Sequence, residues 1–155
     1  MRRKRPVTEP EPLSGAHVLE YTYKRSVGPV LGRFFSGLRD ARIEGVKTRA
    51  GRVLCPPLEH DPETGDATSD EWVEVGPGGS VTTWAWVSEP RVQHPLDRPF
   101  AFALVRLDGA DTGLLHVVDA GREERMRTGM RVRARFASQR TGRIEDIACF
   151  EPEDA

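Results

Sequence analysis

The chain has 155 residues, of which 30% are charged and 37% hydrophobic, and its acidic and basic side chains nearly cancel to a net charge of −1. This length suits one compact domain with a small appendage, and the charge balance argues against a strongly basic nucleic-acid-binding protein. Two distant cysteines do not make a disulfide framework, and the sequence has neither a signal-peptide pattern nor an apolar run of about 20 residues. We therefore expect a soluble, cytoplasmic protein.

The first 15 residues lack the composition of a folded segment. They contain three prolines, charges of both signs and almost no large apolar side chains, so they cannot support a hydrophobic core. We expect residues 1–15 to form a flexible arm or an interdomain linker. A linker at this position also suggests that the natural chain extends further upstream.

Residues 16–44 are predicted to form an N-terminal helical segment. From Val27 onward, apolar side chains recur at steps of three and four residues, which is the spacing of one face of a helix. Pro29 suits the first turn and Ser26 suits the cap. We therefore expect a helix from near Val27 to near Asp40.

Residues 45–70 have the glycine and proline spacing of a zinc ribbon, in which two short knuckles flank a hairpin. Structural zinc needs a tetrahedral set of ligands, mostly thiolates and imidazoles, but other residues stand where the thiols would be. These positions are Lys47, Ala50, Asp61 and Thr64. We therefore predict a degenerate ribbon-like hairpin that holds by side-chain packing, with no zinc and no other cofactor. The alternative is a metal held by His60, Asp61 and Glu63.

From residue 71 the helical spacing gives way to alternation of apolar and polar side chains, which is typical of β-strands. Strands are predicted at Trp72–Val75, Ser80–Glu89, Phe100–Asp108, Leu114–Asp119, Arg131–Ala137 and Ile144–Phe150. A polar, helix-prone stretch at residues 121–129 precedes the penultimate strand. This order predicts a mostly β fold, in which five or six short strands form a small Greek-key barrel.

The predicted strands carry apolar side chains on both faces. Strict alternation assigns Val81, Thr83, Ala85 and Val87 to one face, and small side chains such as Ala101 and Ala103 suit a narrow barrel interior. The other face carries Trp84, Trp86, Phe100, Phe102 and Leu104, which the N-terminal helix or a partner must cover. We therefore predict a binding module. The aromatic residues expected to contact a partner are Tyr21, Tyr23, Phe34, Phe35, Trp84 and Trp86.

Across residues 20–152, the order of short motifs resembles a known family. The motifs are Gly51-Arg52-Val53 with Pro56-Pro57, Trp72-Val73-Glu74-Val75, Gly79-Ser80-Val81 with Trp84, Ala103-Leu104-Val105-Arg106-Leu107-Asp108-Gly109, Gly129-Met130-Arg131-Val132, and Phe150 with Pro152. They resemble the bacterial and archaeal OB-fold proteins with an N-terminal rubredoxin-like zinc ribbon, long labelled a domain of unknown function. The resemblance implies that residues 71–152 form an OB-fold barrel. The absent ribbon cysteines are the departure from the family.

The resemblance also implies a function, because this family accompanies thiolase-fold enzymes that act on acyl-CoA thioesters. In the actinobacterial relatives that look most similar, the domain follows a hot-dog-fold enoyl-CoA hydratase and pairs with a lipid-transfer-protein-like aldolase. That pair cleaves a steroid side-chain CoA thioester by a retro-aldol reaction and releases propionyl-CoA. By resemblance, this chain is a non-catalytic accessory subunit of such a carbon-carbon lyase, in a heterotetramer whose aldolase subunit binds most of the acyl-CoA.

Two other functions fit parts of the sequence. A single-stranded nucleic-acid-binding module would use the basic side chains of Arg131, Arg133 and Arg135 beside aromatic platforms, although the net charge and nearby acidic residues argue against it. A stand-alone acyl-CoA binder is the second alternative. No catalytic residue is predicted, because Cys55 has no identifiable paired base and the sequence has no phosphate loop or nucleophile elbow. His116 is expected to be structural.

Overall fold

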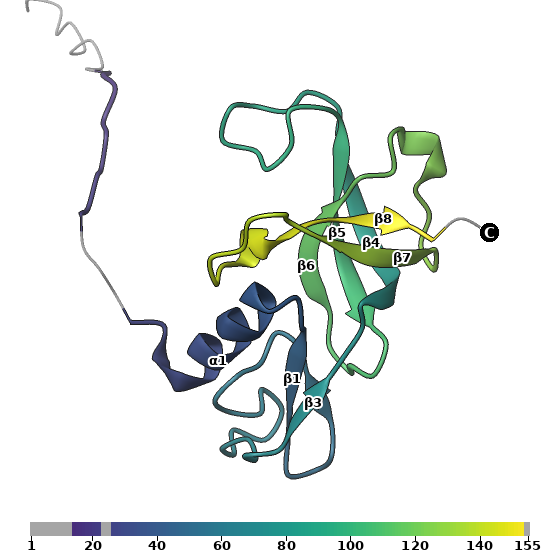
Figure 1. The fold of residues 1–155 in the computed structure, drawn as a ribbon. Coiled ribbons are helices and arrows are strands. Elements are labelled where there is room, and N and C mark those ends of the chain that lie inside the picture. The colour runs from purple at the N-terminus through teal and green to yellow at the C-terminus, as the bar shows by residue number, and fades with distance from the viewer. Residues whose placement is uncertain (1–13, 23–25, 154–155) are drawn as a thin grey trace, which may run out of the picture.

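The computed structural model describes residues 14–22 and 26–153, which form an arm, one α-helix and two β-sheets (Figure 1). Tyr23 and most of the predicted arm at residues 1–15 lie outside the described residues. The helices are α1 (Gly28–Arg39) and the short 3-10 helices η1 (Glu123–Arg125) and η2 (Ile144–Asp146). The strands are β1 (Glu44–Lys47), β2 (Val53–Leu54), β3 (Trp72–Glu74), β4 (Gly78–Val87), β5 (Phe100–Leu107), β6 (Leu114–Val118), β7 (Arg131–Phe136) and β8 (Ile147–Pro152).

Helix α1 forms where the apolar spacing predicts it. The N-cap is Val27 and not the predicted Ser26, although the backbone N–H of Gly28 donates to the Ser26 hydroxyl at 3.3 Å. Pro29 lies in the first turn, where its missing N–H costs no helical hydrogen bond. Phe34 and Leu38, one turn apart, are buried. Because α1 packs on both β1 and η2, the helix joins the small sheet to the barrel.

The ribbon-like hairpin forms, but its sheet contains one strand more than predicted. Strand β1 pairs with β2 on one side and with β3 on the other, both antiparallel. The strand predicted at Trp72–Val75 therefore belongs to this sheet and not to the barrel. Gly45 permits the close pairing of β1 with β2, because a Cβ there would lie 2.7 Å from Cγ1 of Val53 and 2.9 Å from the carbonyl oxygen of Leu54.

Hydrogen bonds attach the hairpin to the connection between β5 and β6. The Val53 N–H donates to a carboxylate oxygen of Asp111 at 2.7 Å, and the Asp111 N–H donates back to the Val53 carbonyl at 2.9 Å. The Cys55 N–H donates to the Thr112 hydroxyl at 2.8 Å. These bonds satisfy backbone groups that β2 leaves unpaired on its outer edge, and they fix the hairpin to one end of the barrel.

Five strands close into a barrel in the order β4-β5-β6-β8-β7, with β7 returning to β4. All neighbours are antiparallel except β6 and β8, which run parallel and share the single pair Val118–Phe150. A five-stranded barrel with this order and one parallel contact has the Greek-key topology of an OB fold. The predicted fold class is therefore confirmed, with five strands and not six.

A β-bulge in β4 changes the alternation of side chains along that strand. Before the bulge, Val81 pairs with Val105. The next pair is Thr83 with Leu104, which leaves Thr82 as an extra residue. An extra residue reverses the face of every side chain that follows it in the strand.

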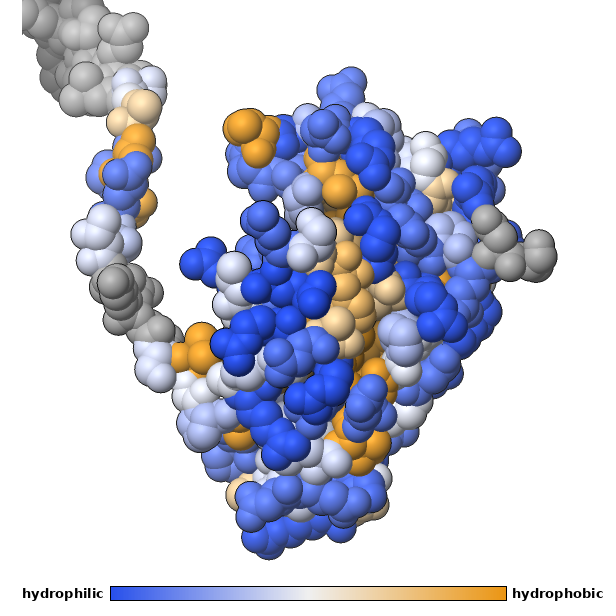
Figure 2. Space-filling model, viewed as in Figure 1, coloured by the Kyte–Doolittle hydropathy of each residue, from blue (hydrophilic) through white to orange (hydrophobic). Residues whose placement is uncertain are grey.

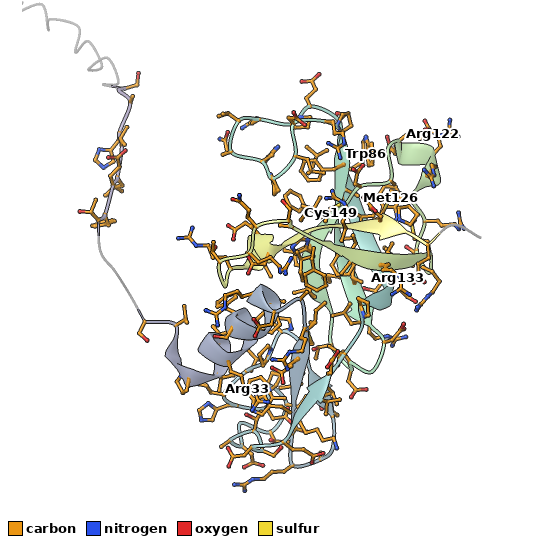
Figure 3. All side chains as sticks on the ribbon, viewed as in Figure 1. Arg33, Trp86, Arg122, Met126, Arg133 and Cys149 are labelled. Atoms are coloured by element: carbon orange, nitrogen blue, oxygen red, sulfur yellow. The ribbon has the colours of Figure 1, made fainter. Side chains whose placement is uncertain are left out.

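The bulge turns two indole side chains into the barrel, so the predicted face assignment for this strand is wrong. Trp84 pairs with Ala103 and Trp86 pairs with Ala101, and both alanines are buried in the interior. The two tryptophans are half-buried and pack against the core, filling the space that the alanines leave. Figure 3 shows Trp86 and the buried Met126 near the same end of the barrel.

The outer face of β5, β6 and β8 carries a second apolar cluster, built on the buried side chains of Phe100, Val117 and Cys149. The connection between β4 and β5 reaches this face, where Leu96 packs on the cluster and the ring of His94 meets that of Phe100 edge-on at 5.7 Å. The connection between β4 and β5 therefore covers Phe100, which we had expected the N-terminal helix or a partner to cover.

A search of the described residues for membrane-spanning helices finds none of sufficient length and hydropathy.

Candidate functional site

Ion pairs connect the two loops that a zinc ion would join in a ribbon. Lys47 pairs with Glu71. The Asp61 carboxylate is only 3% exposed and accepts the Glu63 N–H at 2.9 Å. Nη1 of Arg52 lies 3.5 Å from the Asp61 carboxylate and 2.7 Å from that of Glu63, although its N–H groups are not aligned for a hydrogen bond. The guanidinium of Arg52 thus links one loop to the other by charge.

The residues that the structure describes bring one group of three potential metal ligands together, and it is not the predicted group at His60. It consists of Asp119, Cys149 and Glu151, with one ligand atom from each within 4.8 Å of the others. Arginines already hold these atoms: Arg98 pairs with Asp119, and Arg135 lies 2.6 Å from Glu151 and 3.1 Å from Sγ of Cys149. Burial raises the pKa of the Cys149 thiol despite the nearby Arg135. The group is therefore an ion-pair network, and a metal would have to displace both arginines.

The basic stripe on β7 is exposed, as predicted, but it is not free. The stripe consists of Arg131, Arg133 and Arg135 (Figure 3 labels Arg133). Arg131 makes two hydrogen bonds to Asp108, at 2.7 and 2.6 Å, which lower the pKa of that carboxyl. Glu153 lies 3.2 Å from Arg131 and 2.9 Å from Arg133, and Glu151 pairs with Arg135. Each arginine of the stripe is thus neutralised by a neighbouring carboxylate.

The predicted partner-contact residues do not gather on one surface, and their role stays a prediction. Tyr21 is 76% exposed on the arm, whereas Phe34 is 1% exposed within the core. Phe35 is half-buried beside it, with the two rings 5.6 Å apart. The indoles of Trp84 and Trp86 face the barrel interior. Of the described members, only Tyr21 and Phe35 lie where a partner could reach them without rearrangement of the core.

A shallow apolar groove lies between α1 and the ribbon-like hairpin, and we call it the helix–hairpin groove. It has a volume of about 340 Å³ and is lined by Val27, Val30, Leu31, Pro57, Leu58, Glu59 and His60. Val27 and Leu58 are largely exposed. The sequence contains a signal for this groove, because the apolar residues of α1 span a wider arc than Phe34 and Leu38 need.

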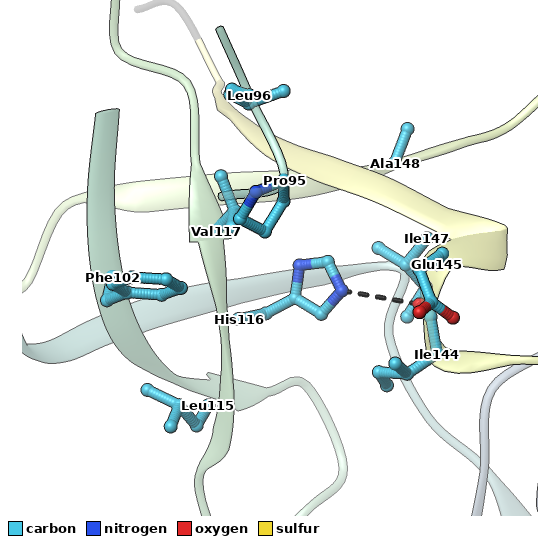
Figure 4. A pocket seen from close by; sticks show the side chains of 10 residues that line it. All are labelled: Pro95, Leu96, Phe102, Leu115, His116, Val117, Ile144, Glu145, Ile147 and Ala148. Carbon is cyan, nitrogen blue, oxygen red and sulfur yellow. Dashed lines mark hydrogen bonds between the residues drawn. The ribbon is translucent and has the colours of Figure 1, made fainter. Parts of the chain in front are cut away.

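A second apolar pocket lies against β6 and β8, and we call it the His116 pocket (Figure 4). Its volume is about 460 Å³, and it is lined by Pro95, Leu96, Phe102, Leu115, His116, Val117, Ile144, Glu145, Ile147 and Ala148. The pocket forms because β6 and β8 pair at a single position and then separate. Sequence patterns do not predict it, since its walls come from three segments that are distant in sequence.

The imidazole of His116 lies in the wall of this pocket and is 9% exposed. Its Nε2 lies 3.4 Å from the carbonyl oxygen of Ile144 and can only donate to it. Nδ1 is buried and has no hydrogen-bond partner. Burial lowers the pKa of His116, and the carbonyls of Ile144 and Val117 and the Glu145 carboxylate oppose this only in part. Nδ1 therefore stays unpaired within the wall and has almost no accessible surface toward the pocket.

Residues 72–137 match the family model described as "ChsH2, C-terminal OB-fold domain". The barrel is an OB-fold domain similar to that of ChsH2. The matched segment includes β3 and the barrel strands β4 to β7, and it ends before β8. No curated protein matches the chain.

Two solved structures share the fold of this chain. One is a protein of unknown function from the DUF35 family of Sulfolobus solfataricus, 23% identical, with a TM-score of 0.56 over 70% of this chain and 77% of that chain. The other is described as the Ltp2-ChsH2(DUF35) aldolase, 19% identical, with a TM-score of 0.60 over 84% of this chain and 100% of that chain. The second likeness extends beyond the barrel, since it covers more of the chain than residues 72–137.

Proposed function

We propose that this chain is an accessory subunit of a thiolase-like aldolase that acts on an acyl-CoA thioester. The observation that carries the proposal is the match of residues 72–137 to the OB-fold domain of ChsH2, together with the likeness of 84% of the chain to a structure named as an Ltp2-ChsH2(DUF35) aldolase. In this role the chain binds the aldolase and supports its activity, while the aldolase carries out the carbon-carbon bond cleavage.

The chemistry of the described residues supports a non-catalytic role. Burial raises the pKa of the Cys55 thiol to about 12 and also raises that of Cys149. Thiols with raised pKa values are poor nucleophiles at neutral pH, because the thiolate is the reactive form. The buried imidazole of His116 has no carboxylate partner on Nδ1 to orient it as a general base. We therefore place the reacting groups on the partner.

The helix–hairpin groove is the surface that we assign to the aldolase partner. It combines exposed apolar side chains from two elements, and apolar patches on a rigid frame are the usual centre of a protein interface. The frame is rigid because the hairpin is bonded to the barrel through Asp111 and Thr112, and α1 is held by Phe34. Phe35 and Tyr21 do not line the groove, and we propose them as further contacts outside it because Tyr21 is exposed and Phe35 half-buried.

The finer features of the proposal follow the family resemblance. They are a heterotetramer with a lipid-transfer-protein-like aldolase, acyl-CoA held mainly by that aldolase, and a hot-dog-fold hydratase domain upstream of this chain. The proposed reaction is retro-aldol cleavage of a steroid side-chain CoA thioester with release of propionyl-CoA. The Arg52 ion pairs support a ribbon that folds without zinc, because they link the same two loops.

Co-purification with an aldolase tests the proposal. A thiolase-like aldolase from the same source is co-expressed with the tagged chain, either wild type or carrying Val27→Asp with Leu58→Asp in the helix–hairpin groove. We expect the wild type to retain the aldolase through size-exclusion chromatography and the groove variant to lose it. The matched control is Val92→Asp, a fully exposed position in the β4–β5 connection, which should behave as wild type. Equal retention by the groove variant would contradict the assigned surface.

A further inference from the structure

The His116 pocket is an apolar hollow in a surface that is mostly hydrophilic. Blue, hydrophilic side chains cover most of the visible body in Figure 2, whereas the side chains that line the pocket are apolar apart from His116 and Glu145. Its volume of about 460 Å³ lies within the range of sites for small ligands. Because Nδ1 of His116 is closed off within the wall, a ligand must bind mainly by apolar contact.

Polar contacts hold two walls of the pocket apart. The buried ring of His116 reaches from β6 to η2, where Nε2 lies 3.4 Å from the Ile144 carbonyl oxygen (Figure 4). Asp146 fixes η2 in turn, because its carboxylate accepts the backbone N–H groups of residues 141–143 at 2.7–3.2 Å. These supports keep β6 and η2 from closing together, although closure would remove apolar surface from water. The hollow is therefore a preformed feature of the barrel.

The connection between β4 and β5 supplies a third wall through Pro95 and Leu96. This connection is anchored by His94, whose ring meets those of Phe100 and Phe102 edge-on at 5.7 and 6.2 Å. Leu96 itself packs on the second apolar cluster. The three walls are thus in place before a ligand enters, which lowers the entropy cost of binding and favours a compact, rigid ligand.

The rim of the pocket restricts the charge of a ligand. Leu115 is 62% exposed, so the pocket is open to solvent beside it. Glu145 is exposed and carries the one carboxylate among the described lining residues, none of which is a lysine or arginine. A carboxylate at the rim repels an anion, and no lining cation offsets that repulsion. The pocket therefore favours an uncharged ligand over an acid.

We propose that the His116 pocket binds a small uncharged molecule with a compact hydrocarbon ring body. The ring body lies between Ile147 and Leu96, and its solvent-facing end lies toward Glu145 and Leu115. Binding removes apolar walls from water that the chain's own supports keep open. The site uses no residue of the helix–hairpin groove, so the proposal does not depend on the aldolase partner.

Two adamantane derivatives with the same ring body test the proposal on the full chain. The neutral probe is 1-adamantanemethanol and the anionic probe is adamantane-1-carboxylate, and NMR shifts of the Leu96 and Ile147 methyl groups report binding. We expect the alcohol to bind with a dissociation constant of about 1 mM or below, and the carboxylate to bind at least about threefold more weakly. Glu145→Gln should tighten carboxylate binding about threefold and leave alcohol binding unchanged. Glu124→Gln, at an exposed residue of η1, is the matched charge control and should change neither.

A second variant tests the location of the site. Ala148→Leu enlarges a side chain in the pocket wall and should weaken alcohol binding about tenfold, because the added methyl groups occupy the hollow. Ala50→Leu, the same change at an exposed position in the hairpin, should bind the alcohol as the wild type does. A urea midpoint close to that of the wild type shows that each variant is folded.

Four results would overturn the proposal. Absence of a saturable shift in the wild type would mean that the pocket holds no such ligand. Equal alcohol affinity in the wild type and folded Ala148→Leu would place the probe elsewhere. Carboxylate binding as tight as alcohol binding in the wild type would remove the preference for an uncharged ligand. Shifts of the same methyl groups that follow protein concentration without a probe would assign the pocket to a second copy of the chain.

Discussion

Asp61 stands where a zinc ribbon would place a thiolate, and its buried carboxylate organises the second loop of the hairpin. It accepts the Glu63 N–H and lies beside the Arg52 guanidinium. We expect Asp61→Ala to lower the free energy of unfolding by about 1–3 kcal/mol, because a buried N–H and a cation lose their partner. Urea denaturation measures the change. The matched control is Glu63→Gln, an exposed partner of the same arginine, which should change stability by less than about 1 kcal/mol.

His116 makes the stability of the fold depend on pH. Its pKa lies below the ordinary value of 6.5 because burial disfavours the imidazolium. The folded protein therefore stays neutral at His116 while the unfolded chain gains a proton below about pH 6.5, so the unfolded state is favoured as pH falls. We expect the free energy of unfolding to decrease by up to about 1.4 kcal/mol per pH unit between pH 6.5 and the lowered pKa.

The measurement is a comparison of urea midpoints at several pH values from 7.5 down to 5, for the wild type and for His116→Gln. The variant should lose this part of the pH dependence. His60→Gln, at an exposed histidine in the hairpin, is the control and should keep it. An unchanged pH profile in His116→Gln would show that the buried imidazole is not the titrating group.

Helix α1 carries both structural residues and proposed contact residues. Phe34 is fully enclosed, so we expect Phe34→Ala to lower the free energy of unfolding by about 3–5 kcal/mol. Val27, at the exposed start of the helix, belongs to the helix–hairpin groove, and Val27→Ala should change stability by less than about 1 kcal/mol. Thermal unfolding measures both changes. Similar stability losses in the two variants would contradict the burial pattern of α1.

Because of the bulge in β4, the Trp86 side chain packs in the barrel and lies outside the proposed interface. We expect Trp86→Ala to lower the free energy of unfolding by about 3 kcal/mol, somewhat less than a fully buried tryptophan would. Aldolase retention by the folded fraction should be unchanged, because the indole packs against Ala101 inside the barrel. Ala85→Ser, on the exposed side of the same strand, is the stability control. If Trp86→Ala lost aldolase binding without losing stability, Trp86 would belong to the interface with the aldolase.

Local patterns predicted the elements well where short-range spacing determines them. The three- and four-residue steps of α1 and the strict alternation of β7 appear in the structure almost at the predicted bounds. The bulge at Thr82 could not be predicted from the sequence. Val81, Thr82 and Thr83 are all β-branched, so the alternation of side-chain types does not reveal which residue is extra. The strand at Trp72–Val75 was assigned to the barrel, but it pairs with β1. The apolar and polar pattern of a strand does not determine which strand it pairs with. The His116 pocket depends on three distant segments and leaves no local signal.

At the scale of the whole molecule, the basic stripe of β7 is paired within the chain, whereas the apolar grooves are open surfaces. The arginines of β7 are held by Asp108, Glu151 and Glu153, so this stripe carries little unpaired positive charge for single-stranded nucleic acid. The helix–hairpin groove and the His116 pocket share no lining residue.

The accessory role is tested most directly by acyl-CoA cleavage with the reconstituted pair against each component alone. Retro-aldol turnover is followed by release of propionyl-CoA from a steroid side-chain CoA thioester, with this chain and the thiolase-like aldolase at equal concentrations. The account predicts turnover by the pair, little or none by the aldolase alone, and none by this chain alone. Val27→Asp with Leu58→Asp should lower turnover in proportion to the lost complex. Full activity of the aldolase by itself, or turnover by this chain by itself, would contradict the account.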